Sequence, residues 1–167
     1  DDFLNFNLEK HISSNTKIVS NLPYYLSTKI LLKVLPFNNG IEEVMFTFQK
    51  EVADRIISKF NSSKYGRLSI LSNWKLEVEK ICDIKPDSFY PKPKVESSLL
   101  FFKPKKIFYQ FKDPRNLEKM TRIFFNQRRK KIKKPFNLIF KDYKRKNLNF
   151  LDLNLRPQNL SPEDYSK

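Results

Sequence analysis

The sequence predicts an α/β domain followed by a smaller, basic helical domain. Short apolar runs alternate with helix-type patterns as far as residue 102, a lysine- and proline-rich stretch follows at residues 103–106, and helical periodicity dominates beyond it. A chain of 167 residues with 40% hydrophobic residues can bury one modest core and carry an appendage. We therefore expect two domains, residues 1–103 and residues 104–167.

The first half opens with a strand, a helix and a second strand. Residues 17–20 and 43–48 are short apolar runs typical of buried strands, and residues 27–35 place apolar side chains at helical spacing. Ser27 or Thr28 can cap the start of that helix. This order and spacing favour a parallel βαβ unit.

Two helices and two strands complete the first half. The pattern predicts helices over residues 49–59 and 65–74, and strands over residues 76–84 and 97–102. A proline-rich loop at residues 85–94 separates the two strands, which we expect to pair antiparallel at a sheet edge.

The second half is expected to be helical. Its first helix has an apolar face of Leu117, Met120, Ile123 and Phe124, and an opposite face of Arg115, Lys119, Arg122, Asn126, Arg129 and Lys133. Pro135 is expected to end or kink this helix. Residues 136–143 and 148–155 are shorter helix candidates, and residues 159–164 are typical of a capped helix start.

Charge divides the chain into two unlike halves. Residues 1–100 carry 14 Lys and Arg against 12 Asp and Glu, whereas residues 101–167 carry 19 against 6, so most of the +15 excess lies in the second half. That half has the composition of a polyanion-binding module. No apolar run approaches the roughly 20 residues that span a bilayer, so we expect no membrane segment. The acidic start lacks an initiator Met and a basic signal region, which indicates a piece of a longer chain.

Single residues argue against several other kinds of site. Cys82, the one cysteine, is expected to be a buried thiol in a reducing compartment, with no metal cluster around it. His11, the one histidine, is expected at a loop or surface rather than in a Ser/His/Asp site. Glu51 and Asp54 are expected to be helix-surface charges rather than an acid–base pair. With only two glycines, no glycine-rich phosphate loop can be written within the chain.

The turn Asn21-Leu22-Pro23-Tyr24 is the first candidate site. An exocyclic aromatic amine is a poor nucleophile, and two acceptors aimed at its hydrogens, the Asn21 side-chain oxygen and the Leu22 carbonyl, would favour a reactive, pyramidal nitrogen. Pro23 fixes the backbone and Tyr24 can stack on a base. A plain strand-to-helix loop explains the same four residues equally well.

A stiff, proline-rich loop and a run of positive charge are the other two candidates. Phe89 lies between Asp87 and Val95 on a loop stiffened by two prolines, where it either closes the second face of a base or packs on the core. Residues 128–134 carry six positive charges in seven positions, which favours phosphate binding over a solvated surface run. The residues predicted to bind RNA are Arg122, Arg128, Arg129, Lys130 and Lys133.

Five segments in order resemble the ribosomal RNA adenine N6,N6-dimethyltransferase family, and most closely its bacterial small-subunit branch, the kasugamycin-sensitivity enzymes. They are Asn21-Leu22-Pro23-Tyr24-Tyr25 and residues 49–53, 65–69, 89–95 and 125–130. Each motif alone is moderately specific, and the five together are highly specific.

The resemblance implies the C-terminal part of a seven-stranded, Rossmann-like methyltransferase sheet, followed by a small helical RNA-binding domain. It implies S-adenosyl-L-methionine as methyl donor, and as substrate two adjacent adenines of small-subunit rRNA in the immature subunit, in the cytoplasm. Asn21 would contact both donor and amine, Leu22 would supply the carbonyl, and Tyr24 and Phe89 would stack on the base. Asp2 matches the acidic residue near the donor's adenine.

The resemblance also predicts a limit and leaves alternatives. The family's glycine-rich loop and its ribose-binding acid would lie before position 1, so we expect this chain alone to bind the donor poorly and to be inactive; micromolar binding in an isothermal titration would refute this. The alternatives are a large-subunit rRNA adenine methyltransferase of the macrolide-resistance type, and a non-catalytic RNA- or DNA-binding relative.

Overall fold

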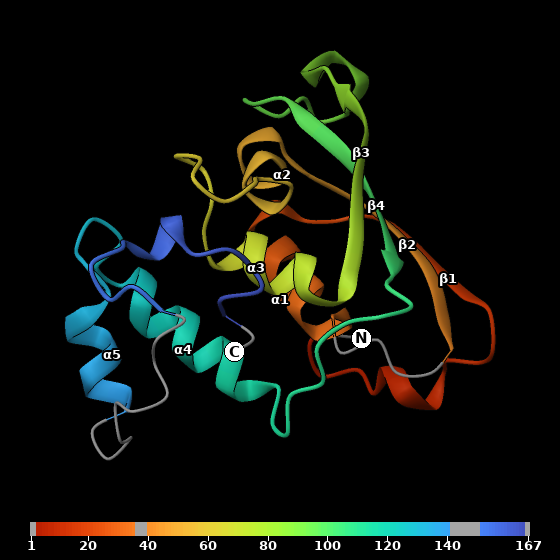
Figure 1. The fold of residues 1–167 in the computed structure, drawn as a ribbon. Helices are drawn as coiled ribbons and strands as arrows, with labels where there is room; N and C mark the ends of the chain where they lie inside the picture. The colour runs from red at the N-terminus through yellow and green to blue at the C-terminus, as the bar shows by residue number, and fades with distance from the viewer. Residues whose placement is uncertain (1–2, 36–39, 141–150, 166–167) are drawn as a thin grey trace.

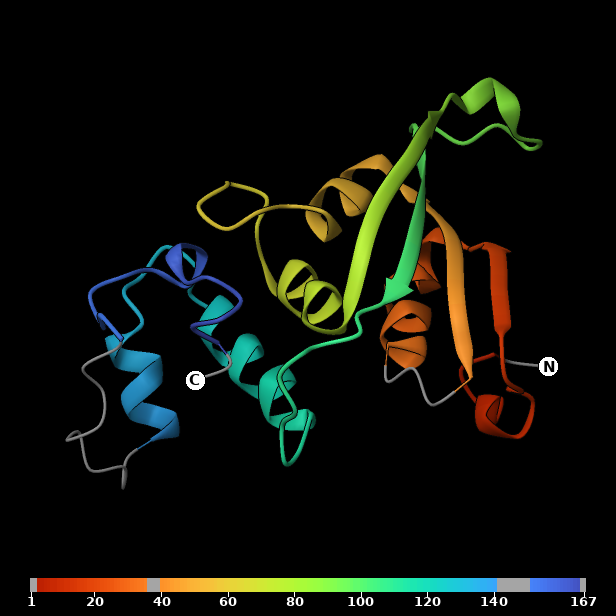
Figure 2. The same cartoon turned by 45° about the vertical axis from the view of Figure 1, so that its right-hand side comes forward.

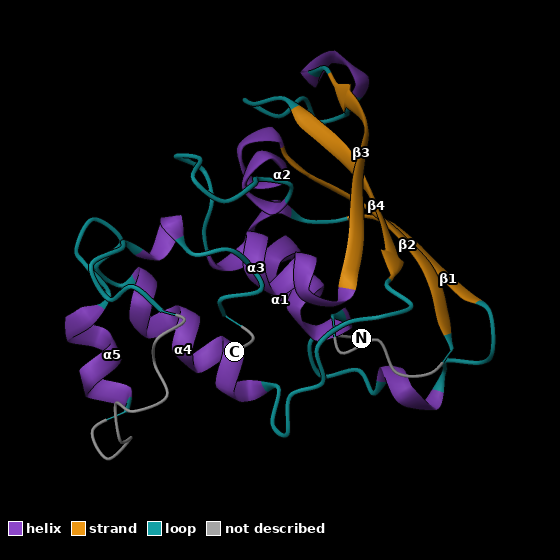
Figure 3. Cartoon of the chain, viewed as in Figure 1, coloured by secondary structure: helices purple, strands orange, loops and turns teal. Residues whose placement is uncertain are grey.

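The fold centres on a mixed sheet of four strands, seen in a computed structural model that describes residues 3–35, 40–140 and 151–165. The sheet order is β1-β2-β4-β3, with helices α1, α2 and α3 on one face (Figures 1 and 2). Helices α4 and α5 lie beyond α3, away from the sheet (Figure 3). The predicted α/β class is confirmed for the described residues.

The predicted parallel βαβ unit is confirmed. Strand β1 (Thr16–Asn21) pairs in parallel with β2 (Ile41–Gln49), and α1 (Tyr24–Val34) connects them. The prediction that α1 starts near Ser27 was wrong, because the helix begins directly after Pro23, whose fixed φ suits a helix entrance. The Ser27 hydroxyl instead donates to the Tyr24 carbonyl within the first turn (2.9 Å).

The entrance to β2 requires a glycine. Gly40 has φ +134°, and a Cβ at this position would lie 2.5 Å from the Ile12 side chain and 2.8 Å from the Ser13 carbonyl oxygen. Its carbonyl accepts the Thr16 N–H at 2.7 Å, which ties the start of β1 to the start of β2.

The remaining elements of the sheet follow the expected order with shorter helices. Helix α2 is Lys50–Ile56 and α3 is Arg67–Lys75. Strands β3 (Leu76–Ile84) and β4 (Ser97–Pro104) pair antiparallel, as predicted, and β4 also pairs antiparallel with β2. Strand β3 therefore forms one edge of the described sheet and β1 the other.

Among the described residues, three short 3-10 helices lie outside the sheet and the main helices. They are Leu8–Lys10, Pro86–Ser88 and Pro157–Asn159. The first belongs to a segment tied to α1 by Lys33, whose amino group donates to the carbonyls of Phe3, Leu4 and Phe6 at 2.6–2.7 Å.

The core lies between the sheet and its three helices. Phe46 and Phe48 of β2 and Phe102 of β4 are fully buried and meet with ring centroids 6.0–6.3 Å apart. Leu31 of α1 and Ile56 of α2 close this layer and expose none of their surface. Fully burying side chains of this size contributes about 1.5–3 kcal/mol each.

Helices α4 and α5, after residue 104, differ from the prediction in the place of Pro135. Helix α4 (Arg115–Phe125) ends well before Pro135, and α5 (Lys133–Ile139) begins after a turn. Pro135 therefore does not end a helix: it lies in the first turn of α5, where its missing N–H costs no helical hydrogen bond. The candidate helix at 136–143 is represented by α5, and residues 141–143 lie outside the described residues.

The C-terminal residues pack back on α4 without forming the predicted helix. Residues 151–155 are not helical, and residues 148–150 of that candidate lie outside the described part. Ser161 and Asp164 cap each other, since each backbone N–H donates to the other's side chain at 2.9 and 3.2 Å. The residues after Ser161 form a turn, however, and not the helix whose capped start was predicted at residues 159–164. Tyr165 is buried against Phe124 and Phe125.

Three single-residue predictions can now be compared with the structure. Cys82 is exposed on the edge strand β3, so the prediction of a buried thiol was wrong; its apolar neighbours Ile81 and Ile84 do not cover it, because Ile81 is itself 48% exposed. His11 is exposed and stacks on Phe6, as expected of a surface residue. Glu51 pairs with Arg55 and Asp54 with Lys64, as expected of helix-surface charges. Within the described residues no helix is long and apolar enough to cross a membrane.

Candidate functional site

The Asn21-Leu22-Pro23-Tyr24 turn lies at the carboxyl end of β1. Asn21 is the last residue of the strand and is exposed, Leu22 is buried, and Tyr24 opens α1. In open α/β sheets, ligands bind in the crevice outside the carboxyl ends of the parallel strands. The βαβ unit therefore places this turn where such a fold binds its ligands.

A residue that the sequence reasoning missed, Thr47, fixes the turn. Thr47 lies opposite Asn21 in the β1–β2 register and exposes only 8% of its surface. Its hydroxyl accepts the Leu22 N–H at 3.2 Å and donates to the Asn21 side-chain oxygen. A threonine in the otherwise apolar run of β2 was the signal that could have revealed it.

Two acceptors stay open at this turn. The Asn21 oxygen keeps a second lone pair beyond the Thr47 bond. The Leu22 carbonyl accepts no hydrogen bond from the residues that the structure describes. The turn therefore offers two oxygens of the kind that an exocyclic amine needs, one of them oriented by Thr47.

Tyr24 links this turn to the base of the proline-rich loop. Its hydroxyl lies 2.6 Å from the Oγ of Ser97, the fully buried first residue of β4. Ser97 pairs with Ile84, so these two residues mark the points where the chain enters and leaves the loop that carries Phe89. The hydrogen bond between Tyr24 and Ser97 thus joins the turn to the base of the loop that carries Phe89, the second predicted stacking residue.

On the loop itself, Tyr90 is more exposed to solvent than Phe89. Phe89 is half-buried, whereas Tyr90 is fully exposed. No ring contact joins Phe89 to Tyr24 among the described residues. The structure brings Asn21, Leu22, Pro23 and Tyr24 together, and leaves Phe89 on the adjacent loop.

A polar cluster anchors that loop. Asp83 accepts a hydrogen bond from the Ser98 hydroxyl at 2.6 Å and lies 3.2 Å from the Lys50 amino group, which also pairs with Glu96. The Ser98 bond, followed by the bonds from Lys50 and Lys80, lowers the pKa of Asp83 to about 2. The hydrogen bond to Glu96, followed by the one to Asp83, raises the pKa of Lys50. Residues from β3, β4 and α2 therefore hold both ends of the loop together.

The predicted RNA-binding residues lie on α4, on the turn that follows it and at the start of α5. Arg122, Arg129, Lys130 and Lys133 are exposed, and within the described residues no carboxylate lies within 4.0 Å of their charged groups. The sequence suggested that the basic run, residues 128–134, continues one helix. The structure shows instead a turn that leads into α5, with Ile132 fully buried in the middle of the run.

Hydrogen bonds to the C-terminal segment and to the loop after α2 fix the shape of this basic turn. The backbone N–H groups of Ile132 and Lys133 donate to the carbonyls of Leu155 and Leu153. Arg128 donates to the Ser63 carbonyl at 2.5 Å and Lys131 donates to the Asn154 side-chain oxygen at 3.2 Å, so both of these basic groups also have structural contacts. Asp2, the candidate for contact with the donor, lies outside the described residues.

The sequence is similar to proteins of one family. The family model described as "Ribosomal RNA adenine dimethylase" matches residues 1–167. The "Ribosomal RNA small subunit methyltransferase A" of Pelagibacter ubique is 55% identical over 171 residues, covering 100% of this chain and 65% of the relative. The protein of the same name from Francisella tularensis subsp. novicida is 38% identical, covering 98% of this chain and 64% of the relative. The chain thus spans a little under two thirds of the length of these relatives.

Solved structures show the same fold. A dimethyladenosine transferase from Plasmodium falciparum superposes with a TM-score of 0.80 at 23% identity, covering 99% of this chain and 68% of that one. The 23S rRNA methyltransferase ErmE superposes with a TM-score of 0.66 at 19% identity, covering 98% and 66%. With the family match over its whole length and relatives above 30% identity, the chain belongs to the ribosomal RNA adenine dimethylase family.

Proposed function

We propose that this chain carries the adenine-binding and RNA-binding parts of an rRNA adenine-N6,N6-dimethyltransferase. The substrate is a pair of adjacent adenines in small-subunit rRNA, within the immature subunit in the cytoplasm. The observation that carries the proposal is the pair of open acceptors at the end of β1, the Asn21 side-chain oxygen and the Leu22 carbonyl. The small-subunit names of the relatives favour this substrate over large-subunit rRNA.

The two acceptors act on the adenine amine. Each accepts one N–H of the amine, which draws the nitrogen lone pair out of conjugation and toward the incoming methyl group. Thr47 holds the Asn21 oxygen in place before the base arrives, so its reorientation does not oppose the reaction. Tyr24 and Phe89 stack on the two faces of the flipped base, at roughly 1–3 kcal/mol per contact.

The methyl donor implied by the family is S-adenosyl-L-methionine. The exposed Asn21 amide at the carboxyl end of a parallel edge strand fits a donor bound in the same crevice, since its nitrogen has no partner among the described residues. Asn21 would hold the donor from this side and Asp2 from another. When bound, the donor supplies an electrophilic methyl group.

The basic residues position the RNA. Arg122, Arg129, Lys130 and Lys133 bind phosphates, and Arg128 adds to this surface while holding the turn to Ser63. We propose residues 1–103 as part of a seven-stranded methyltransferase sheet and residues 104–167 as the helical RNA-binding domain. Among the described strands β1 pairs only with β2, so its other edge is available to a further strand of this larger sheet.

Methylation of defined RNAs tests the proposal. In a chimera, the family's glycine-rich N-terminal segment, taken from the Pelagibacter ubique relative, precedes residue 1. Immature small subunits and, in a parallel reaction, large-subunit rRNA are incubated with S-adenosylmethionine, and we expect N6,N6-dimethyladenosine at two adjacent positions of the small-subunit rRNA. Modification of large-subunit rRNA alone would assign the macrolide-resistance type, and RNA binding without modification would assign a binding protein.

A further inference from the structure

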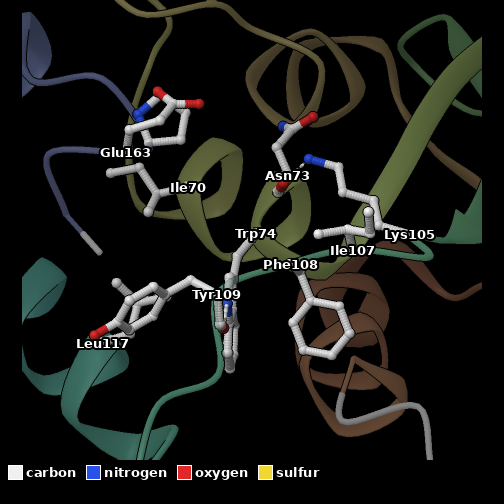
Figure 4. A pocket seen from close by; sticks show the side chains of 10 residues that line it. Ile70, Asn73, Trp74, Lys105, Ile107, Phe108, Tyr109, Leu117 and Glu163 are labelled. Carbon is white, nitrogen blue, oxygen red and sulfur yellow. Dashed lines mark hydrogen bonds between the residues drawn. The ribbon is translucent and has the colours of Figure 1, made fainter. Parts of the chain in front are cut away.

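An aromatic pocket lies on the side of α3 away from the candidate active site. Its volume is about 350 Å³, at the lower end of the range for ligand pockets. Figure 4 shows Trp74, Phe108 and Tyr109 in the lower part of the view, with Lys105 and Asn73 at the upper right and Glu163 at the upper left. The wall residues come from α3, from the segment after β4, from α4 through Leu117, and from the C-terminal segment.

The aromatic wall is rigid and partly open. Trp74 meets Phe108 and Phe111 edge to face, with centroids 6.1 and 5.0 Å apart, and its indole N–H donates to the Tyr109 carbonyl at 2.7 Å. The ring centroids of Tyr109 and Phe111 lie 4.8 Å apart, and 53% of the surface of Tyr109 remains exposed. A ring that is fixed in place and half exposed can stack on an aromatic ligand without losing much side-chain entropy.

Lysines carry the charge beside this aromatic wall, whereas Glu163 lies on the opposite side of the pocket. The Lys75 amino group lies over the rings of Trp74 and Phe108, 4.5 and 5.2 Å from their centroids, and the Lys105 amino group donates to the Asn73 carbonyl at 2.6 Å. Among the described residues, no carboxylate lies within 4.0 Å of the amino groups of Lys75, Lys105 or Lys106. Burial lowers the pKa of Lys75, so an anion nearby would be favourable.

The pocket is separate from the Asn21 turn. It adjoins the end of α3, where the chain enters β3, whereas Asn21 ends β1 at the opposite edge of the described sheet (Figure 1). A ligand bound here would therefore not occupy the candidate acceptors at Asn21 and Leu22.

We propose that this pocket binds an unpaired base of single-stranded RNA, stacked on Tyr109, with the neighbouring phosphate on Lys105 and Lys106. Aromatic rings interleaved with unpaired lysines are the combination that single-stranded nucleic acids require. An apolar peptide would use the rings but not the lysines, so the charge decides for RNA. The inference needs no methyl transfer and stands whether or not the proposed activity is found.

The single tryptophan of the chain gives a direct readout. The chain is titrated at low salt with unlabelled hexaadenylate and, separately, with unlabelled hexauridylate. The fluorescence emission of Trp74 is recorded in each titration. We expect saturable quenching by at least one of the two oligonucleotides. Tyr109→Ala should weaken the affinity about tenfold, which is the size expected for one lost stacking contact. The matched control is Phe60→Ala, which removes an aromatic ring that is 47% exposed in the loop after α2 and does not line the pocket, so it should leave the affinity unchanged.

A second pair of variants tests the charge and guards against misfolding. The double variant Lys105→Gln, Lys106→Gln should weaken quenching more than Lys10→Gln, Lys29→Gln, which removes two exposed charges elsewhere. Two results overturn the proposal. One is oligonucleotide binding, measured by anisotropy of a labelled copy, without any change in Trp74 emission. The other is quenching of Trp74 emission that is as strong in Tyr109→Ala as in Phe60→Ala, and as strong in the Lys105/Lys106 variant as in the Lys10/Lys29 variant.

Discussion

The Thr47 hydroxyl joins Asn21 to Leu22 across the β1–β2 pair, accepting the Leu22 N–H at 3.2 Å and donating to the Asn21 side-chain oxygen. One buried side chain thus sets the position of both residues that carry the candidate acceptors. The parallel pairing of β1 with β2 places Thr47 opposite Asn21. The two strands alone therefore bring the Thr47 hydroxyl to the turn.

Thr47→Val tests this arrangement. Valine keeps the shape but leaves the buried Leu22 N–H without a partner, which should reduce the free energy of unfolding by about 1–3 kcal/mol. In the active chimera, kcat should fall about tenfold with little change in the KM for RNA, because the Asn21 oxygen loses its orientation. Thr47→Ser retains the hydroxyl and should restore kcat. A valine variant with unchanged kcat would show that Thr47 serves only the fold.

The Asp83 cluster predicts a pH dependence at the loop base. The folded pKa of Asp83 is lowered from 3.8 to about 2, so its contribution is complete above the unfolded pKa and is lost as the pH falls toward 2. We expect wild type to melt at a higher temperature than Asp83→Asn at pH 5, and the gap to close between pH 4 and pH 2. A gap that stays constant over this range would contradict the role of the carboxylate.

The basic turn predicts a graded response to salt. Arg129→Gln, Lys130→Gln and Lys133→Gln together should lower the slope of log K against log salt for single-stranded RNA by about 2, at roughly 0.7 per phosphate contact. The control replaces three exposed lysines elsewhere, Lys10, Lys29 and Lys59, with Gln. Equal slopes for the two triple variants would rule out a specific phosphate surface at this turn.

Ile132 anchors the same turn to the protein. It is fully buried between exposed lysines, and its N–H donates to the Leu155 carbonyl at 2.9 Å. Ile132→Ala should cost about 2–5 kcal/mol of unfolding free energy in urea titrations, because it opens a cavity under the turn. Leu138→Ala in α5, where the side chain is 62% exposed, is the control and should change stability little. Comparable losses in the two variants would contradict this anchoring role.

The sequence predicted the parts of the fold that depend on local pattern. The βαβ unit, and the antiparallel pairing of residues 76–84 with 97–102, followed from apolar runs and from the proline-rich loop between the strands. The start of α1 was placed three residues too late, because the capping preference of Ser27 was weighed above the fixed φ of Pro23. Cys82 was placed inside because its apolar neighbours suggested a buried strand, whereas β3 is an edge strand.

The site was predicted only as far as its turn. Asn21-Leu22-Pro23-Tyr24 is contiguous, so the sequence revealed it, whereas Thr47 and Ser97 reach it from other strands and depend on register. The basic run was recognised from composition, but its bend at Ile132 depends on contacts with Leu153 and Leu155, which are distant in the chain. Long-range contacts therefore account for what the local pattern left undetermined.

Asn21→Ala in the chimera tests the central claim most directly. Methyl incorporation into immature small subunits is measured together with RNA affinity. We predict that incorporation falls about hundredfold, since one acceptor for the adenine amine is lost, while RNA affinity stays within about twofold of wild type. Undiminished methyl incorporation in Asn21→Ala would contradict the account.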